Sequence, residues 1–157
     1  MKIKTLTAGF CVALALTSTL ANADITLRHA LTGEALDLSF AKKGGDTEAF
    51  KEFLKTGKNP YNSNEKFVAE GKSLYMTGCS GCHGHEAEGK LGPGLADDYW
   101  TYPSGLTDQG LFEILFGGAN GMMGPQYVNF STDQMLQIMA FLRSIYTGDP
   151  QKAKWLK

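Results

Sequence analysis

Residues 79–83 read Cys-Ser-Gly-Cys-His, and this short stretch decides the fold. Two cysteines three positions apart, followed at once by a histidine, form the C-x-x-C-H signature of covalent haem attachment. The thiols of Cys79 and Cys82 would each form a thioether with one vinyl group of a porphyrin. His83 would then supply the proximal imidazole to the iron. The sequence therefore predicts one covalently bound haem c.

Other uses of these cysteines are weaker hypotheses. A structural zinc site needs four ligands, but the remaining histidines are His29 and His85, and the third cysteine is Cys11. We interpret both histidines as ordinary polar residues. A disulfide or a redox-active dithiol is the other alternative.

Residues 1–23 have the pattern of a secretory signal peptide. Lys2 and Lys4 precede an apolar run that ends in Ala-Asn-Ala, so cleavage is expected after Ala23 and export to the periplasm follows. The run is short and rich in small residues for a membrane span, and an uncleaved anchor is the alternative. Loss of the two lysines takes the net charge from −1 to about −3. A mildly acidic surface argues against nucleic acid, and no membrane insertion is expected after cleavage.

The rest of the chain predicts short helices separated by glycine-rich loops. Glycine makes up 19 of 157 residues, above the average of about 7%. The Thr32-Gly33 pair predicts a turn between two extended pieces. Four helices are expected. The first is capped by Asp46 or Thr47 and ended by Gly57, and the second runs from Asn64 to Gly78. The third runs from Thr107 to Phe116, and the fourth is capped by Ser131 or Thr132 and stopped by Gly148 and Pro150. We predict an extension over residues 24–60, packed on a domain over residues 61–157.

Two of these helices are expected to cross closely. Gly71, Leu74 and Tyr75 lie on one helical face, and Phe141 and Leu142 lie on one face of the last helix. A glycine at the crossing point permits two backbones to approach.

A methionine loop follows the third helix. Residues 117–125 read Gly-Gly-Ala-Asn-Gly-Met-Met-Gly-Pro, which is irregular chain rather than a helical stripe. A methionine sulfur on the second face of the haem closes the iron for electron transfer, whereas an open site would bind gases or peroxide. We predict Met123, which is closer to Pro125, as the distal ligand in preference to Met122.

Aromatic residues lie between the haem motif and the methionine loop. Tyr99, Trp100 and Tyr102 could donate hydrogen bonds to haem propionates while their rings shield the porphyrin edge. Ordinary packing in the core is the alternative for each of them.

Over residues 64–147 the order of these features resembles a class I cytochrome c. Four longer runs resemble the cytochrome cL family more closely: CSGCHGHEAEGKLGPGL, DDYWTYPSG, LFEILFGGANGMMGP and IYTGDP. The segment LTGEALDLS is similar to the N-terminal extension of that family. The resemblance thus covers most of the chain beyond residue 23.

The resemblance implies a mostly α-helical class I cytochrome c fold, wrapped around one haem and preceded by an extension. Cys79 and Cys82 would be the thioether residues, His83 the proximal ligand and Met123 the distal ligand. Within Leu91–Leu95, the carbonyl of Pro93 would accept the Nδ1–H of the proximal histidine and orient its ring. The resemblance also leaves room for a calcium ion, but it assigns no residues to one.

The function implied is electron transfer rather than enzyme catalysis. Members of the family accept electrons from PQQ-dependent methanol dehydrogenase, and this chain would pass them to a second cytochrome c, as a monomer. One alternative is a generic class I cytochrome c that serves another periplasmic dehydrogenase. The other is a haem enzyme or sensor with an open iron site.

Overall fold

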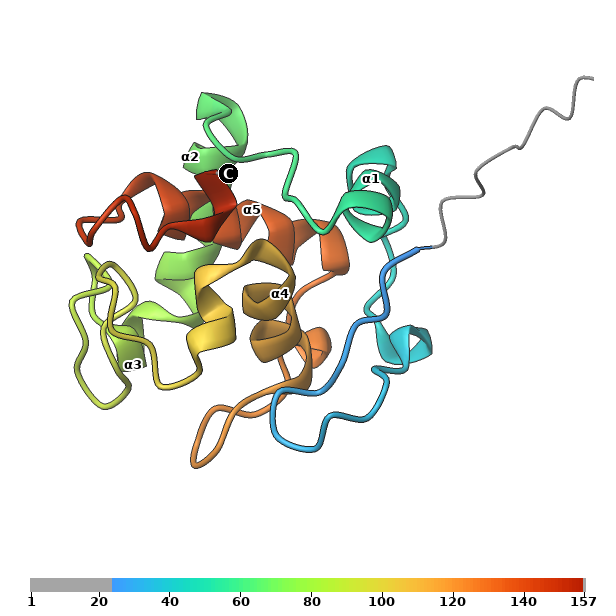
Figure 1. The fold of residues 1–157 in the computed structure, drawn as a ribbon, viewed down its shortest axis with the longest axis horizontal. Coiled ribbons are helices and arrows are strands. Elements are labelled where there is room, and N and C mark those ends of the chain that lie inside the picture. Colours follow the sequence, from blue (N-terminus) through green and yellow to red (C-terminus); the bar gives the residue numbers. More distant parts are fainter. Residues whose placement is uncertain (1–23, 157) are drawn as a thin grey trace, which may run out of the picture.

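Helices and loops account for residues 24–156, the part of the chain that this computed structural model describes (Figure 1). In chain order the helices are η1 (Leu38–Phe40), α1 (Glu48–Thr56), α2 (Glu65–Gly78), α3 (Ser80–His83), η2 (Pro103–Leu106), α4 (Asp108–Gly117), η3 (Gln126–Val128), α5 (Thr132–Ser144) and η4 (Lys154–Leu156). Extended pairing in residues 24–156 is limited to two isolated bridges, Arg28 with Ala35 and Lys42 with Ser131. The predicted mostly α-helical fold is confirmed.

Side chains of the expected type begin the long helices. Thr47, Asn64, Thr107 and Ser131 each accept a backbone N–H from the first turn that follows, and Ser131 forms a full capping box with Gln134. The sequence left Asp46 or Thr47, and Ser131 or Thr132, open as caps. The structure selects Thr47 and Ser131, which have extended backbones. Gly57 ends α1 in the left-handed conformation at φ 69°.

Helices α2 and α5 cross at Gly71, as predicted. A Cβ atom added there would lie 1.9 Å from the carbonyl oxygen of Gln137 in α5, so only glycine allows this approach. One turn further along α2, the ring of Tyr75 packs on that of Phe141 with centroids 5.2 Å apart. The crossing fixes α2, whose C-terminal end leads into the haem motif, against the buried face of α5.

Residues 24–60 pack on this helical core. The backbone N–H of Arg28 donates to the carboxylate of Glu113 in α4 at 2.9 Å, and Leu27 is buried. The antiparallel bridge between Arg28 and Ala35 closes the predicted turn, in which Gly33 has a φ of 73°. Helix α1 presents Phe50 and Phe53 to Phe112 of α4, with ring centroids 5.6 and 5.0 Å apart. The division of the chain into an extension and a domain stays a prediction.

The last helix ends earlier than expected, and the chain after it turns back over the protein. Helix α5 ends at Ser144, before Gly148 and Pro150. Thr147 then donates its backbone N–H to Ala96 at 2.7 Å, and the Trp155 ring lies 3.8 Å from the guanidinium carbon of Arg143. This tertiary pairing replaces the final helical turn.

No helix within residues 24–156 is long and apolar enough to cross a membrane. The predicted signal peptide, residues 1–23, lies outside the described part of the chain.

Candidate functional site

His83 is the central residue of the site, and one of its ring nitrogens is already bound. Helix α2 ends at Gly78, Cys79 lies between the two helices, and α3 delivers His83 into a buried position where it is 7% exposed. Its Nδ1 lies 2.8 Å from the carbonyl oxygen of Pro93, which can only accept a hydrogen bond. The proton is therefore on Nδ1, and the lone pair on Nε2 is left to bind a metal.

The loop after the motif holds Pro93 in place. Gly89 donates its N–H to the carbonyl of His83 at 2.8 Å, and Gly92 donates to Cys82 at 2.9 Å. A Cβ atom at Gly92 would lie 2.8 Å from Cε1 of the His83 ring, so the glycine allows the loop to pass beside the imidazole. From the other side, the hydroxyl of Tyr75 donates to the carbonyl of Gly84 at 2.7 Å. The backbone of the loop thus orients the His83 ring, and the Tyr75 hydroxyl holds the residue that follows it.

Cys79 and Cys82 are free thiols in this structure. Burial, with a smaller contribution from Cys82, raises the pKa of the Cys79 thiol to about 11. Redox-active dithiols depend on a lowered thiol pKa, so this environment does not favour thiol redox chemistry. Two unpaired thiols beside a histidine with a free Nε2 are the donor set that haem c requires. The residues present fit that cofactor.

The two methionines of the loop have different surroundings. Met122 is 83% exposed, whereas Met123 is partly buried and packs against the core cluster. The N–H of Ala119 donates to the carbonyl of Met123 at 2.8 Å and closes the loop on itself. At Gly118, which has a φ of 82°, a Cβ atom would lie 2.8 Å from that same carbonyl oxygen. Burial favours Met123 over Met122 as the ligand, and its ligation stays a prediction.

The aromatic residues differ in what their polar groups do. The indole N–H of Trp100 donates to the carbonyl of Asp97 at 3.0 Å, so the one donor of this side chain is engaged within its own loop. Tyr99 is 76% exposed. The hydroxyl of Tyr102 accepts the backbone N–H of Asn120 at 3.0 Å, which connects it to the methionine loop.

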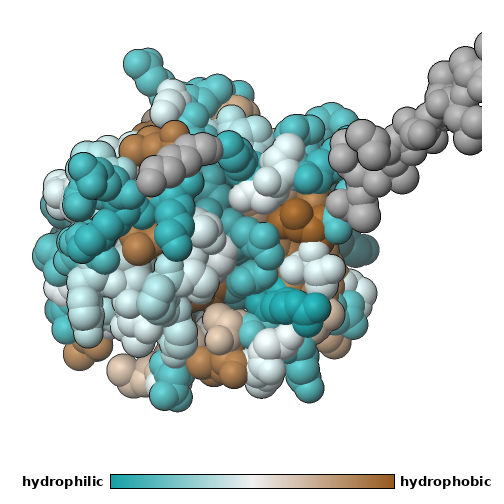
Figure 2. Space-filling model, in the orientation of Figure 1, coloured by the Kyte–Doolittle hydropathy of each residue, from teal (hydrophilic) through white to brown (hydrophobic). Residues whose placement is uncertain are grey.

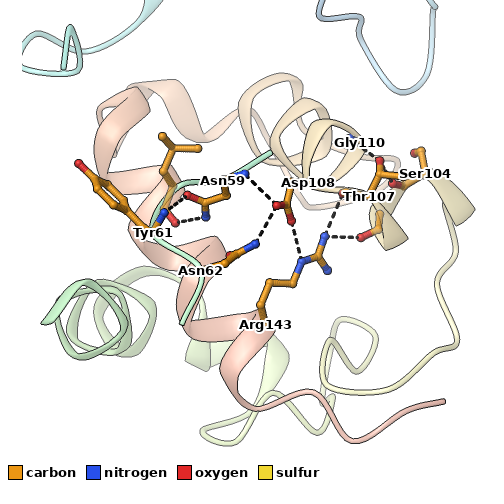
Figure 3. Close-up of polar contacts among 10 residues, drawn as sticks. Asn59, Tyr61, Asn62, Ser104, Thr107, Asp108, Gly110 and Arg143 are labelled. Atoms are coloured by element: carbon orange, nitrogen blue, oxygen red, sulfur yellow. Dashed lines mark hydrogen bonds and ion pairs between the residues drawn. The ribbon is translucent and has the colours of Figure 1, made fainter. Parts of the chain in front are cut away.

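The protein also contains a buried ion pair that the sequence analysis did not identify (Figure 3). The Nε of Arg143 donates to Asp108 at 3.0 Å, and the two side chains are 4% and 1% exposed. Asp108 also accepts from the N–H of Asn59 at 2.9 Å and from the side-chain amide of Asn62 at 2.8 Å. Burial lowers the pKa of Arg143, and the neighbouring carboxylate of Asp108 opposes this shift. An arginine within the apolar face of α5 was the only sequence signal for the pair.

The guanidinium of Arg143 also binds the chain that leads to the aromatic residues. Its Nη2 donates to the carbonyl oxygens of Gly105 and Thr107 at 3.0 and 2.9 Å. The ring of Trp100 packs over Gly105, where a Cβ atom would lie 2.4 Å from it. Helix α5 therefore anchors the segment that contains Trp100 and Tyr102.

The structure assigns no residues to a calcium ion. Among residues 24–156, no group of three or more histidine, cysteine, aspartate or glutamate side chains is placed to hold a metal ion.

The chain is similar to several known proteins. The model of the family described as cytochrome c matches residues 68–145. Cytochrome c-L of Methylorubrum extorquens AM1 is 58% identical over 133 residues, which cover 84% of this chain and 68% of that protein. The crystal structure of cytochrome cL from the marine methylotroph Methylophaga aminisulfidivorans has a TM-score of 0.82 and 56% identity, covering 85% of this chain and 89% of that one. The corresponding structure from Hyphomicrobium denitrificans has a TM-score of 0.82 and 50% identity, covering 86% and 82%.

Proposed function

We propose that this chain, which belongs to the cytochrome cL family, takes single electrons from a PQQ-dependent methanol dehydrogenase and passes them to a second cytochrome c. As a class I cytochrome c it is an electron carrier with covalently bound haem c, and it is not an enzyme. The 58% identity to cytochrome c-L is the observation that carries the choice of donor. A relative with a solved structure comes from a methylotroph, which supports it.

In this proposal each residue of the site has one task. Cys79 and Cys82 tether the cofactor by thioether bonds, Nε2 of His83 is the proximal ligand, and the sulfur of Met123 is the distal ligand. The carbonyl of Pro93 fixes the His83 ring and increases its basicity through the 2.8 Å hydrogen bond. Haem c supplies a reversible one-electron change at iron. The protein contributes orientation, exclusion of water and a closed coordination sphere.

The proposed place of work is the periplasm, reached by export through residues 1–23. The encounter with the donor is expected to be small and transient, burying less than about 1,200 Å². On the side drawn in Figure 2, the apolar surface forms separate patches among hydrophilic residues. Scattered apolar contacts with charges around them suit a complex that must dissociate after each electron.

The test is reduction of the purified haem-containing protein by methanol dehydrogenase and methanol, followed by the haem absorption. We expect rapid reduction that requires methanol and slows as salt rises, because screening weakens charge-steered docking. Calcium-type and lanthanide-type dehydrogenases should both be assayed.

A quinoprotein dehydrogenase for another substrate serves as the control donor. Rapid reduction by that enzyme, with none by either methanol dehydrogenase, would overturn the choice of donor and leave a class I carrier for a different dehydrogenase. Ready binding of carbon monoxide without a distal methionine signal would instead favour the open-site alternative.

A further inference from the structure

The methionine loop, residues 118–124, is joined to the rest of the protein by few hydrogen bonds. Its own hydrogen bonds join Ala119 to Met123 and Gly124 to Met122. Neighbours in sequence add a bond from Gly118 to Ile114 and one from Gln126 to Gly124. The tip of the loop, Asn120 to Met122, is exposed. Loops with few buried contacts open at low free-energy cost. A hydrogen bond to a residue outside the loop would therefore determine how readily this loop opens.

Tyr102 supplies that hydrogen bond. Its hydroxyl accepts the backbone N–H of Asn120 at 3.0 Å across 18 positions of sequence. Among residues 24–156, it is the side chain distant in sequence that hydrogen-bonds to this loop. The bond reaches the exposed tip, three residues before Met123, where the loop's own hydrogen bond runs from the N–H of Gly121 to the Asn120 side chain at 3.0 Å.

The backbone of Tyr102 is itself held in place by neighbouring residues. Its carbonyl accepts the N–H of Gly105 at 2.9 Å at the start of η2. Gly105 is covered by the Trp100 ring, and its carbonyl is bound by Arg143. The phenol therefore belongs to a segment that Arg143, the α5 member of the buried ion pair, binds through Gly105. A rigid donor–acceptor partner of this kind can restrain a loop, whereas a mobile side chain could not.

We infer that Tyr102 is a positioning residue for the distal ligand: through Asn120 it holds the loop in the arrangement that presents the sulfur of Met123. This inference rests on the proposed assignment of Met123 and differs from the propionate role expected for Tyr102. Removing the hydroxyl keeps the ring but takes away the acceptor of the Asn120 N–H, which releases the tip of the loop. An external ligand then displaces the sulfur more easily.

The experiment compares Tyr102→Phe with the unchanged protein, both carrying haem, by imidazole titration of the oxidised form. One net hydrogen bond corresponds to imidazole binding that is about 3- to 10-fold tighter in the variant. Hydrogen exchange at the Asn120 amide should accelerate by a similar factor, since this amide loses its acceptor. Tyr146→Phe is the matched control, because the Tyr146 hydroxyl donates to the carbonyl of Asp149 at 3.1 Å rather than binding the methionine loop, and it should change neither readout.

Three results would overturn the inference. One is unchanged imidazole affinity and Asn120 exchange in Tyr102→Phe. A second is a lower unfolding midpoint with unchanged imidazole affinity, which describes a purely structural tyrosine. A third is a shifted pH dependence of the reduction potential with unchanged ligand exchange, which describes a propionate donor. If the unchanged protein itself lacks the methionine-to-iron charge-transfer band, the ligand assignment fails instead, and the two failures are thereby told apart.

Discussion

At the scale of single residues, the proposed distal ligand is one of two adjacent methionines. The two differ in how far their side chains are buried. Met122 is 83% exposed, whereas Met123 packs partly buried against the core cluster. A sulfur that binds iron inside the protein must face inward, and successive residues of an irregular loop rarely share a direction. The loop therefore presents one sulfur to the interior and the other to water.

Met123→Ala should abolish the methionine-to-iron charge-transfer band of the oxidised protein and lower its reduction potential. The reason is that a thioether ligand raises the potential of a histidine-ligated haem. Absorption spectroscopy and a redox titration measure both effects. Met122→Ala is the control and should preserve the band and the potential. The opposite pattern would transfer the ligand role to Met122.

At the scale of elements, the close crossing of α2 and α5 positions the haem motif. Gly71 touches the backbone of α5 at Gln137, so a larger residue cannot be accommodated by turning a side chain. In an exposed helix, alanine would stabilise by about 1 kcal/mol relative to glycine. At this crossing overpacking opposes that gain, and backbone atoms move at greater cost than side chains.

Gly71→Ala should therefore destabilise the haem-containing protein by about 1–3 kcal/mol in urea or guanidinium unfolding. Ser73→Ala, an exposed position two residues along the same helix, should stay within about 0.5 kcal/mol. Equal stability of Gly71→Ala and the unchanged protein would mean that the two helices separate without penalty.

At the scale of the whole molecule, one buried ion pair joins segments far apart in sequence. Asp108 begins α4 and binds Asn59 and Asn62 from the chain before α2. Arg143 extends the same network to η2, and its guanidinium stacks on Trp155 of the C-terminal segment. Removing one partner of such a pair leaves a buried charge without compensation, which is more costly than the pair itself is stabilising.

Asp108→Asn should lower the free energy of unfolding by about 3–5 kcal/mol, because Arg143 stays buried and positively charged. Asp98→Asn breaks the more exposed ion pair with Lys152 and should cost less than about 1 kcal/mol. Thermal or denaturant unfolding of both variants measures the difference. If Asp108→Asn and Asp98→Asn lowered the free energy of unfolding by similarly small amounts, the network's role in joining these segments would be contradicted.

Much of the fold could be predicted because its signals are local. Thr47, Asn64, Thr107 and Ser131 cap helices through bonds to residues three positions away. The end of α5 could not be predicted in this way. Its periodic pattern continues to Ile145, but the N–H of Thr147 is taken by Ala96, a contact set by the tertiary fold.

The sequence by itself determined the haem motif, since Cys79, Cys82 and His83 are covalent neighbours whose spacing needs no distant segment. It also determined the starts of the long helices to within one residue, and the glycine at the helix crossing. Only the tertiary structure decided which methionine lies inward, what Tyr102 binds, and that Asp108 meets Arg143. Those features depend on burial and on pairs 18 and 35 positions apart. No local pattern encodes such pairings, because they form only when the remote segments have packed together.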